Sequence, residues 1–71
     1  MNNEIQAAYL KDIVYEILDE LEEIRRKKNI DLYDAGQKSA YTHILRTIQP
    51  WIDTDELKNF GLNIDIDKKY S

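Results

Sequence analysis

The apolar residues in the first third of the chain recur with a helical period. Steps of three and four residues separate the members of one set: Ala7, Leu10, Val14, Ile17, Leu21 and Ile24. This spacing defines a heptad seam, and because no Gly or Pro interrupts it, it predicts a helix from about residue 3 to residue 28. Ile13 and Leu18 flank the seam and widen it to the apolar face of a bundle helix. Such a face packs against a partner helix, either within the chain or in another copy of it.

A second apolar face follows a polar turn. Its members are Ala40, Tyr41, Ile44, Leu45, Ile48, Trp51 and Ile52. They predict a second helix over about residues 32–52, antiparallel to the first because the connection is short. Pro50 lies inside this range, where it removes a backbone hydrogen bond and clashes with the preceding turn. We therefore expect a kink or a break near Pro50.

The start of the second helix has two competing caps. Asp31 can cap it with Asp34 at the third helical position, and Asp34 with Gln37 is an alternative three residues later. Gly36 would lie in the first turns, where glycine costs about 1 kcal/mol relative to alanine. We expect a close approach of the first helix at Gly36 to compensate for this cost.

The residues after Pro50 predict a short third helix over about residues 54–60. Thr54 is its expected cap, and Gly61 suits the left-handed backbone conformation just past its end. Leu57 and Leu62 would then make the apolar contact of a Schellman motif.

The tail, residues 62–71, alternates apolar residues with Asn and Asp. This is a strand period, but a single strand has nothing to pair with here. We expect an extended C-terminal arm that packs over the helices or across a neighbouring subunit. The chain thus predicts a single all-α domain, residues 1–71: a long antiparallel helical hairpin, a short third helix and an extended arm.

The small size of the domain favours assembly. A chain of 71 residues buries only about 60% of the surface that its unfolded form exposes, so a monomer is marginal. The absence of cysteine removes disulfides and thiolate metal sites as remedies. We expect a homodimer or a higher helical-bundle oligomer, with the heptad seam as its interface.

Charge is unevenly distributed along a chain whose net charge is −4. The run Arg25, Arg26, Lys27 and Lys28 closes the first helix, where positive charge complements the helix dipole. It could also contact phosphates, which makes a small nucleic-acid-binding regulator the alternative hypothesis. The negative net charge and the small number of basic residues on the second helix disfavour nucleic acid.

An acidic stripe on the first helix is the other charged feature. Its members lie at helical spacings of three, four and seven residues: Glu16, Asp19, Glu20 and Glu23. No Glu-x-x-His motif and no matching Glu on the second helix accompany them, so we expect no metal site. The stripe is instead a candidate face for a basic protein partner. His43, the single histidine, has no nucleophile or orienting carboxylate at helical spacing, so we expect neither catalysis nor a cofactor.

One stretch resembles a known group of proteins. The segment "LYDAGQKSAYTHILRTIQPWI", followed by "FGLNIDID", is similar to small uncharacterised proteins of Gram-positive bacteria and their prophages. The matching positions are Tyr33, Gly36, Ala40, Tyr41, Ile44, Leu45 and Ile48. The resemblance implies a short helical protein with no assigned activity and no catalytic residues.

Together these features predict a non-enzymatic interaction or accessory protein, encoded by a mobile element, that presents a helical surface to a protein partner. The first residues contain no basic segment leading into an apolar run, and no apolar stretch approaches the roughly 18 residues of a membrane span. We therefore expect a cytoplasmic protein that does not bind membranes.

Overall fold

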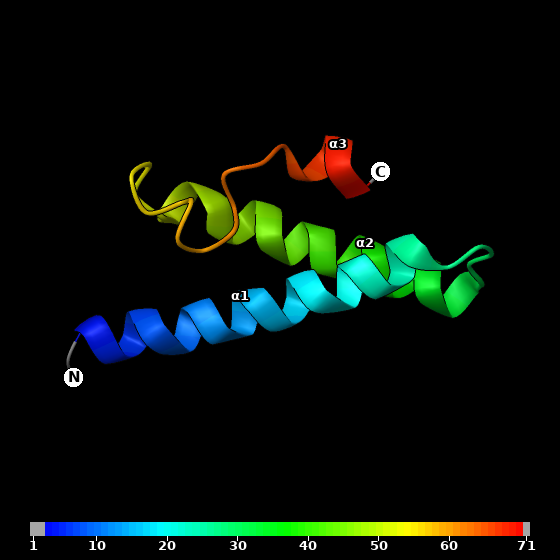
Figure 1. Ribbon diagram of the computed structural model, residues 1–71, viewed down its shortest axis with the longest axis horizontal. Helices are drawn as coiled ribbons and strands as arrows, with labels where there is room; N and C mark the ends of the chain where they lie inside the picture. The colour runs from blue at the N-terminus through cyan, green and yellow to red at the C-terminus, as the bar shows by residue number, and fades with distance from the viewer. Residues whose placement is uncertain (1–2, 71) are drawn as a thin grey trace.

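Two long helices dominate the molecule. The computed structural model describes the backbone of residues 3–70 and the side chains of residues 8–70. Helix α1 (Asn3–Arg26) and helix α2 (Leu32–Ile48) pack as an antiparallel hairpin, followed by a 3-10 turn, η1 (Gln49–Trp51), and a short helix, α3 (Ile66–Tyr70). Figure 1 shows the chain turning back after η1 and ending in α3 beside α2. The predicted helical hairpin is confirmed.

The start of α2 is fixed by a capping box. The Asp31 side chain accepts a hydrogen bond of 2.8 Å from the backbone N–H of Asp34, and the Asp34 carboxylate accepts one from the N–H of Asp31. These two bonds satisfy N–H groups that have no partner inside the helix. The first of the two caps expected from the sequence is therefore the one that forms.

The end of α2 coincides with the single proline. The α-helix stops at Ile48, and Pro50 lies in η1, where its missing N–H is tolerated. The predicted break near Pro50 is confirmed. The expected close approach at Gly36 is wrong, because a Cβ atom built there would meet nothing within 4 Å.

The predicted helix at residues 54–60 is also wrong, although its predicted end is correct. The segment forms consecutive turns, in which bonds such as Glu56 N–H to the Asp53 carbonyl span only three residues. A short segment with few apolar anchors cannot offset the cost of helix nucleation. It nevertheless closes with a Schellman motif: the N–H groups of Leu62 and Gly61 donate to the carbonyls of Leu57 and Lys58, at 2.9 and 3.1 Å. Gly61 has the required positive φ of 70°.

The tail is extended only as far as Asp65. There the Asp65 side chain accepts a hydrogen bond from the backbone N–H of Lys68, and the Asp65 carbonyl accepts one from the N–H of Lys69. These two bonds cap the start of α3. Ile66 and Tyr70, four residues apart, place their side chains in the core. The expectation of a fully extended arm is thus wrong, since a local cap and two buried side chains convert its end into a helix.

The core joins both long helices to the C-terminal segment. Its buried members are Val14, Ile17, Leu21, Leu45, Ile48, Phe60, Leu62, Ile66 and Tyr70. Three members of the heptad seam therefore pack inside a single chain, and a fourth, Ile24, is also buried. Within residues 3–70, no helix combines the length and the apolarity needed to cross a membrane.

Candidate functional site

The C-terminal segment covers only one side of the helical hairpin. The Tyr15 hydroxyl on α1 donates a hydrogen bond to the Asn59 carbonyl, and Arg46 on α2 forms an ion pair of 3.2 Å with Asp67. Two residues along an α-helix correspond to a rotation of about 200°. Ile13 and Ile44, each two residues before these contacts, therefore point to the opposite side of the hairpin.

This opposite side carries matching apolar stripes on the two helices. The stripe on α1 consists of Leu10, Ile13 and Ile17, and that on α2 of Tyr41, Ile44 and Ile48, with the same spacing of three and four residues. Ile13 is 53% exposed and Ile44 is 39% exposed, whereas Ile17 and Ile48 are buried members of the core. We call these six residues the open face. Among residues 8–70, Ile13 and Ile44 thus keep β-branched side chains partly exposed to solvent on this face.

The predicted interface residues divide between the core and the open face. Val14, Leu21 and Ile24 of the heptad seam are buried away from the open face, whereas the half-buried Leu10 and the buried Ile17 belong to it. The side chain of Ala7 lies outside the described residues. The helical period thus identified the apolar side of α1, but Ile13, which only flanks the seam, is the residue that reaches solvent.

The acidic stripe lies on the outer surface of α1. Glu16, Asp19 and Glu23 are exposed, and Glu20 is half-buried. Among the described residues, no group of three or more His, Asp or Glu side chains is placed to hold a metal ion. His43 is exposed on α2. The stripe therefore presents negative charge to solvent without forming a closed set of ligands.

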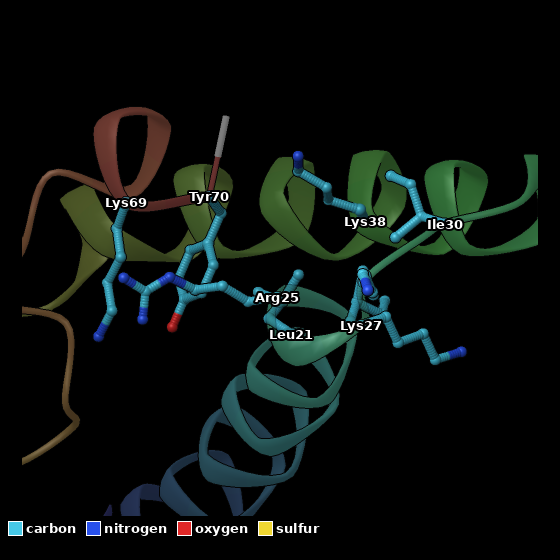
Figure 2. A pocket seen from close by; sticks show the side chains of 9 residues that line it. Leu21, Arg25, Lys27, Ile30, Lys38, Lys69 and Tyr70 are labelled. Atoms are coloured by element: carbon cyan, nitrogen blue, oxygen red, sulfur yellow. The ribbon is translucent and has the colours of Figure 1, made fainter.

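The basic run takes part in a second feature, a concave pocket at the closed end of the hairpin. Figure 2 shows its side chains arriving from the end of α1, from α2 and from α3. The pocket has a volume of about 280 Å³ and is lined by Leu21, Ile24, Arg25, Lys27, Lys28, Ile30, Lys38, Lys69 and Tyr70. Three of the four residues of the basic run line it, and Arg26 does not. We call this feature the cationic pocket.

An ion pair fixes one wall of the cationic pocket. Lys27 Nζ lies 2.8 Å from Oδ1 of Asp34, whose side chain is 6% exposed. The hydrogen bond from Lys27 lowers the pKa of Asp34, and the same bond raises the pKa of Lys27. Both groups therefore remain charged at neutral pH. The pair links the basic run to the capping box of α2, so that the end of α1 and the start of α2 are held together.

Four pocket residues were missed by sequence reasoning: Ile30, Lys38, Lys69 and Tyr70. Lys38 and Lys69 are far from the basic run in the sequence, and only the fold brings them beside it. One sequence signal could have predicted α3: Asp is a preferred N-cap residue, and Asp65 caps this helix through the N–H of Lys68. A helix that starts after Asp65 contains Lys69 and Tyr70.

Comparisons with protein-family models, with curated proteins and with solved structures found no match. The resemblance to small uncharacterised proteins of Gram-positive bacteria and their prophages therefore stays a prediction.

Proposed function

We propose that this protein is a non-enzymatic interaction protein that self-associates through the open face. The observation that carries the proposal is the exposure of Ile13 and Ile44 on the one side of the hairpin that its own C-terminal segment leaves bare. Apolar stripes on adjacent helices are normally covered by a further layer of structure. A partner that supplies this layer removes both isoleucines from water.

A second copy of the chain is the occupant that we propose. Two helical hairpins that place their open faces together form a four-helix arrangement, in which the apolar stripes become the core of a bundle. A twofold axis makes such a contact self-complementary, so that Ile13 of one copy can meet Ile44 of the other. Marginal stability of a 71-residue monomer favours the same outcome.

The charge distribution supports this choice of surface. The acidic stripe borders the open face, because Glu16 and Glu20 lie three residues after Ile13 and Ile17 on α1. Glu16 and Glu20 would lie at the polar rim of the dimer contact, while the exposed Asp19 and Glu23 would stay available to a basic protein partner. Each copy carries a net charge of −4, so added salt should screen the repulsion between copies and strengthen association.

Sedimentation equilibrium over a range of protein concentrations tests the proposal. The wild-type protein should exceed the monomer mass of 8.4 kDa, and Ile13→Asp and Ile44→Asp should return it to that mass while far-ultraviolet circular dichroism stays helical. Leu32→Asp is the matched control, because Leu32 is 91% exposed at the start of α2 and its replacement should leave the mass unchanged. A wild-type protein that remains monomeric at high concentration overturns the proposal.

The nucleic-acid regulator is the second candidate function. The observation in its favour is that Arg25, Lys27 and Lys28 lie beside Lys38 and Lys69 rather than apart. Its weaknesses are the net charge of −4 and the absence of a long basic stripe. Retention on immobilised DNA at about 50 mM salt, lost as salt is raised, would support it. Complete absence of retention at that salt would exclude it.

A further inference from the structure

The cationic pocket concentrates positive charge in an otherwise acidic protein. Five of its nine lining residues are Lys or Arg and none is acidic, although the chain holds only ten Lys and Arg in total against fourteen Asp and Glu. Such a concentration in a concave site attracts anions, because low-dielectric walls focus the field.

Two of the five cations have no counter-ion among the described side chains. Lys27 pairs with Asp34, while Arg25 and Lys69 share Glu22 at 3.5 and 3.4 Å. No carboxylate of residues 8–70 lies within ion-pair distance of Lys28 or Lys38. Glu22 and Asp34 together pair with three of the five cations, and the charges of Asp31 and Glu23 also raise the pKa of Lys27. Lys28 and Lys38 are therefore the two pocket cations that are left to attract an anion.

The rest of the lining is apolar or aromatic. Leu21 and Ile24 are buried at the floor, Ile30 from the hairpin turn is 46% exposed, and Tyr70 comes from α3. Figure 2 shows Lys38 on α2 across the pocket from Lys69 and Tyr70, with Leu21 and Arg25 between them. This combination suits a ligand with an apolar or planar body and a strongly anionic group.

We propose that the cationic pocket binds a small phosphate-bearing molecule with a planar ring, of the size of a mononucleotide. The volume of about 280 Å³ is close to the lower end of small-molecule sites. Phosphate matches the guanidinium of Arg25 and the free ammonium groups of Lys28 and Lys38. A ring would lie over the floor formed by Leu21 and Ile24. A duplex cannot enter a concavity of this size, and its phosphates need a row of cations along a surface instead.

Such a ligand would also tie the C-terminal helix to the hairpin. Lys69 and Tyr70 belong to α3, Arg25 to the last turn of α1, Lys28 to the turn that follows it, and Lys38 to α2. A molecule that contacts all three helices raises the free energy of unfolding by binding only the folded state. Binding should therefore raise the melting temperature of the protein.

Isothermal titration calorimetry with defined probes tests the assignment. We expect adenosine diphosphate to bind at least about tenfold more tightly than pyrophosphate, because only the former fills the apolar floor, and adenosine without phosphate not to bind measurably. Lys28→Gln combined with Lys38→Gln should weaken binding of adenosine diphosphate by about tenfold or more. Neither lysine has a described ion pair, so the folded state and the sedimentation mass should stay unchanged.

The matched control removes the same charge elsewhere. Lys11→Gln combined with Lys58→Gln takes two lysines from outside the pocket and should change the affinity by less than about twofold. Equal weakening by both pairs of substitutions, or absence of binding by both phosphate probes, overturns the proposal. Tighter binding of a single-stranded oligonucleotide would assign the surface to nucleic acid instead. Equal binding of citrate would show a general anion site, contrary to the phosphate assignment.

Discussion

The hydroxyl group of Tyr70 donates a hydrogen bond of 3.1 Å to Oε1 of Glu22, a residue 48 positions earlier in the chain. Lys69 Nζ lies 3.4 Å from the same oxygen. Tyr70 is buried and Glu22 is half-buried, so the contact joins α3 to α1 at the edge of the core. It also closes one side of the cationic pocket, which Tyr70 and Lys69 line.

The contact predicts an alkaline transition in stability. Burial, together with the hydrogen bond to Glu22, raises the pKa of Tyr70 from 10.0 to about 12. A group whose pKa is higher in the folded state stabilises that state fully below its unfolded pKa. The contribution of Tyr70 should therefore be complete below about pH 10 and be lost as the pH rises through about 12. Urea unfolding at a series of pH values measures this loss.

Tyr70→Phe is the variant that isolates this transition. It should lower the free energy of unfolding by about 1 kcal/mol at neutral pH, since one hydrogen bond to a partly solvated carboxylate is lost. The difference from the wild-type protein should disappear at the highest pH. An equal difference at every pH would mean that the phenol ring, rather than its hydroxyl group, holds α3 in place.

The same contact should make stability depend on pH in the acid range, through Glu22. Burial opposes ionisation of Glu22, but the hydrogen bonds from Tyr70 and Lys69 outweigh it and lower its pKa. The stability that Glu22 supplies is therefore present above its unfolded pKa and is lost as the pH falls through its folded pKa. In Glu22→Gln, the free energy of unfolding should fall less steeply at acid pH than in the wild-type protein. An equally steep fall in both proteins would contradict this.

Three features of this fold that each depend on one local residue were predicted from the sequence. Asp31 starts α2, Pro50 ends it, and Gly61 closes the turns through a Schellman motif. Each of these residues acts through its own backbone conformation or its own hydrogen bond, so neighbouring residues suffice to predict its effect.

Features that depend on distant partners were not predictable in the same way. The period of the heptad seam showed which side of α1 is apolar, but not that Leu62 and Ile66 of the same chain would pack into the core that contains it. The alternation of the tail matched a strand, although α3 forms because Ile66 and Tyr70 gain burial. The cationic pocket likewise needs Lys38 and Lys69 beside Arg25, a proximity that only tertiary packing creates.

Shortening a leucine side chain should destabilise the protein much more in the core than at the exposed start of α2. Leu45 is fully buried between α1 and the C-terminal segment, so Leu45→Ala should cost about 2–5 kcal/mol of unfolding free energy. Leu32→Ala makes the same chemical change at a side chain that is 91% exposed and should stay within about 0.5 kcal/mol. Chemical denaturation of both variants measures the contrast, and similar costs at the two positions would show that Leu45 is not central to the core.

The start of α2 should depend on Asp31. Asp31→Ala removes the acceptor of the Asp34 N–H bond, and loss of such a cap costs about 1 kcal/mol. Thr54→Ala is the control, because Thr54 had the sequence position of a cap but lies in turns that form no helix. It should change stability by less than about 0.5 kcal/mol. A larger effect at Thr54 than at Asp31 would indicate that residues 54–60 are helical in solution.

The two glycines should respond to alanine with opposite signs. Gly61 has a φ of 70°, and a Cβ atom there would lie 3.0 Å from Cδ1 of Leu18 and 3.3 Å from Cε1 of Tyr15. Gly61→Ala should therefore cost at least about 1 kcal/mol, from backbone strain and from crowding against α1. Gly36 lies inside α2 with open space around it, so Gly36→Ala should stabilise the protein by about 0.5–1 kcal/mol through higher helix propensity. Paired denaturation curves measure both changes, and a destabilising Gly36→Ala would reveal a close neighbour at that position, such as a second copy of the chain.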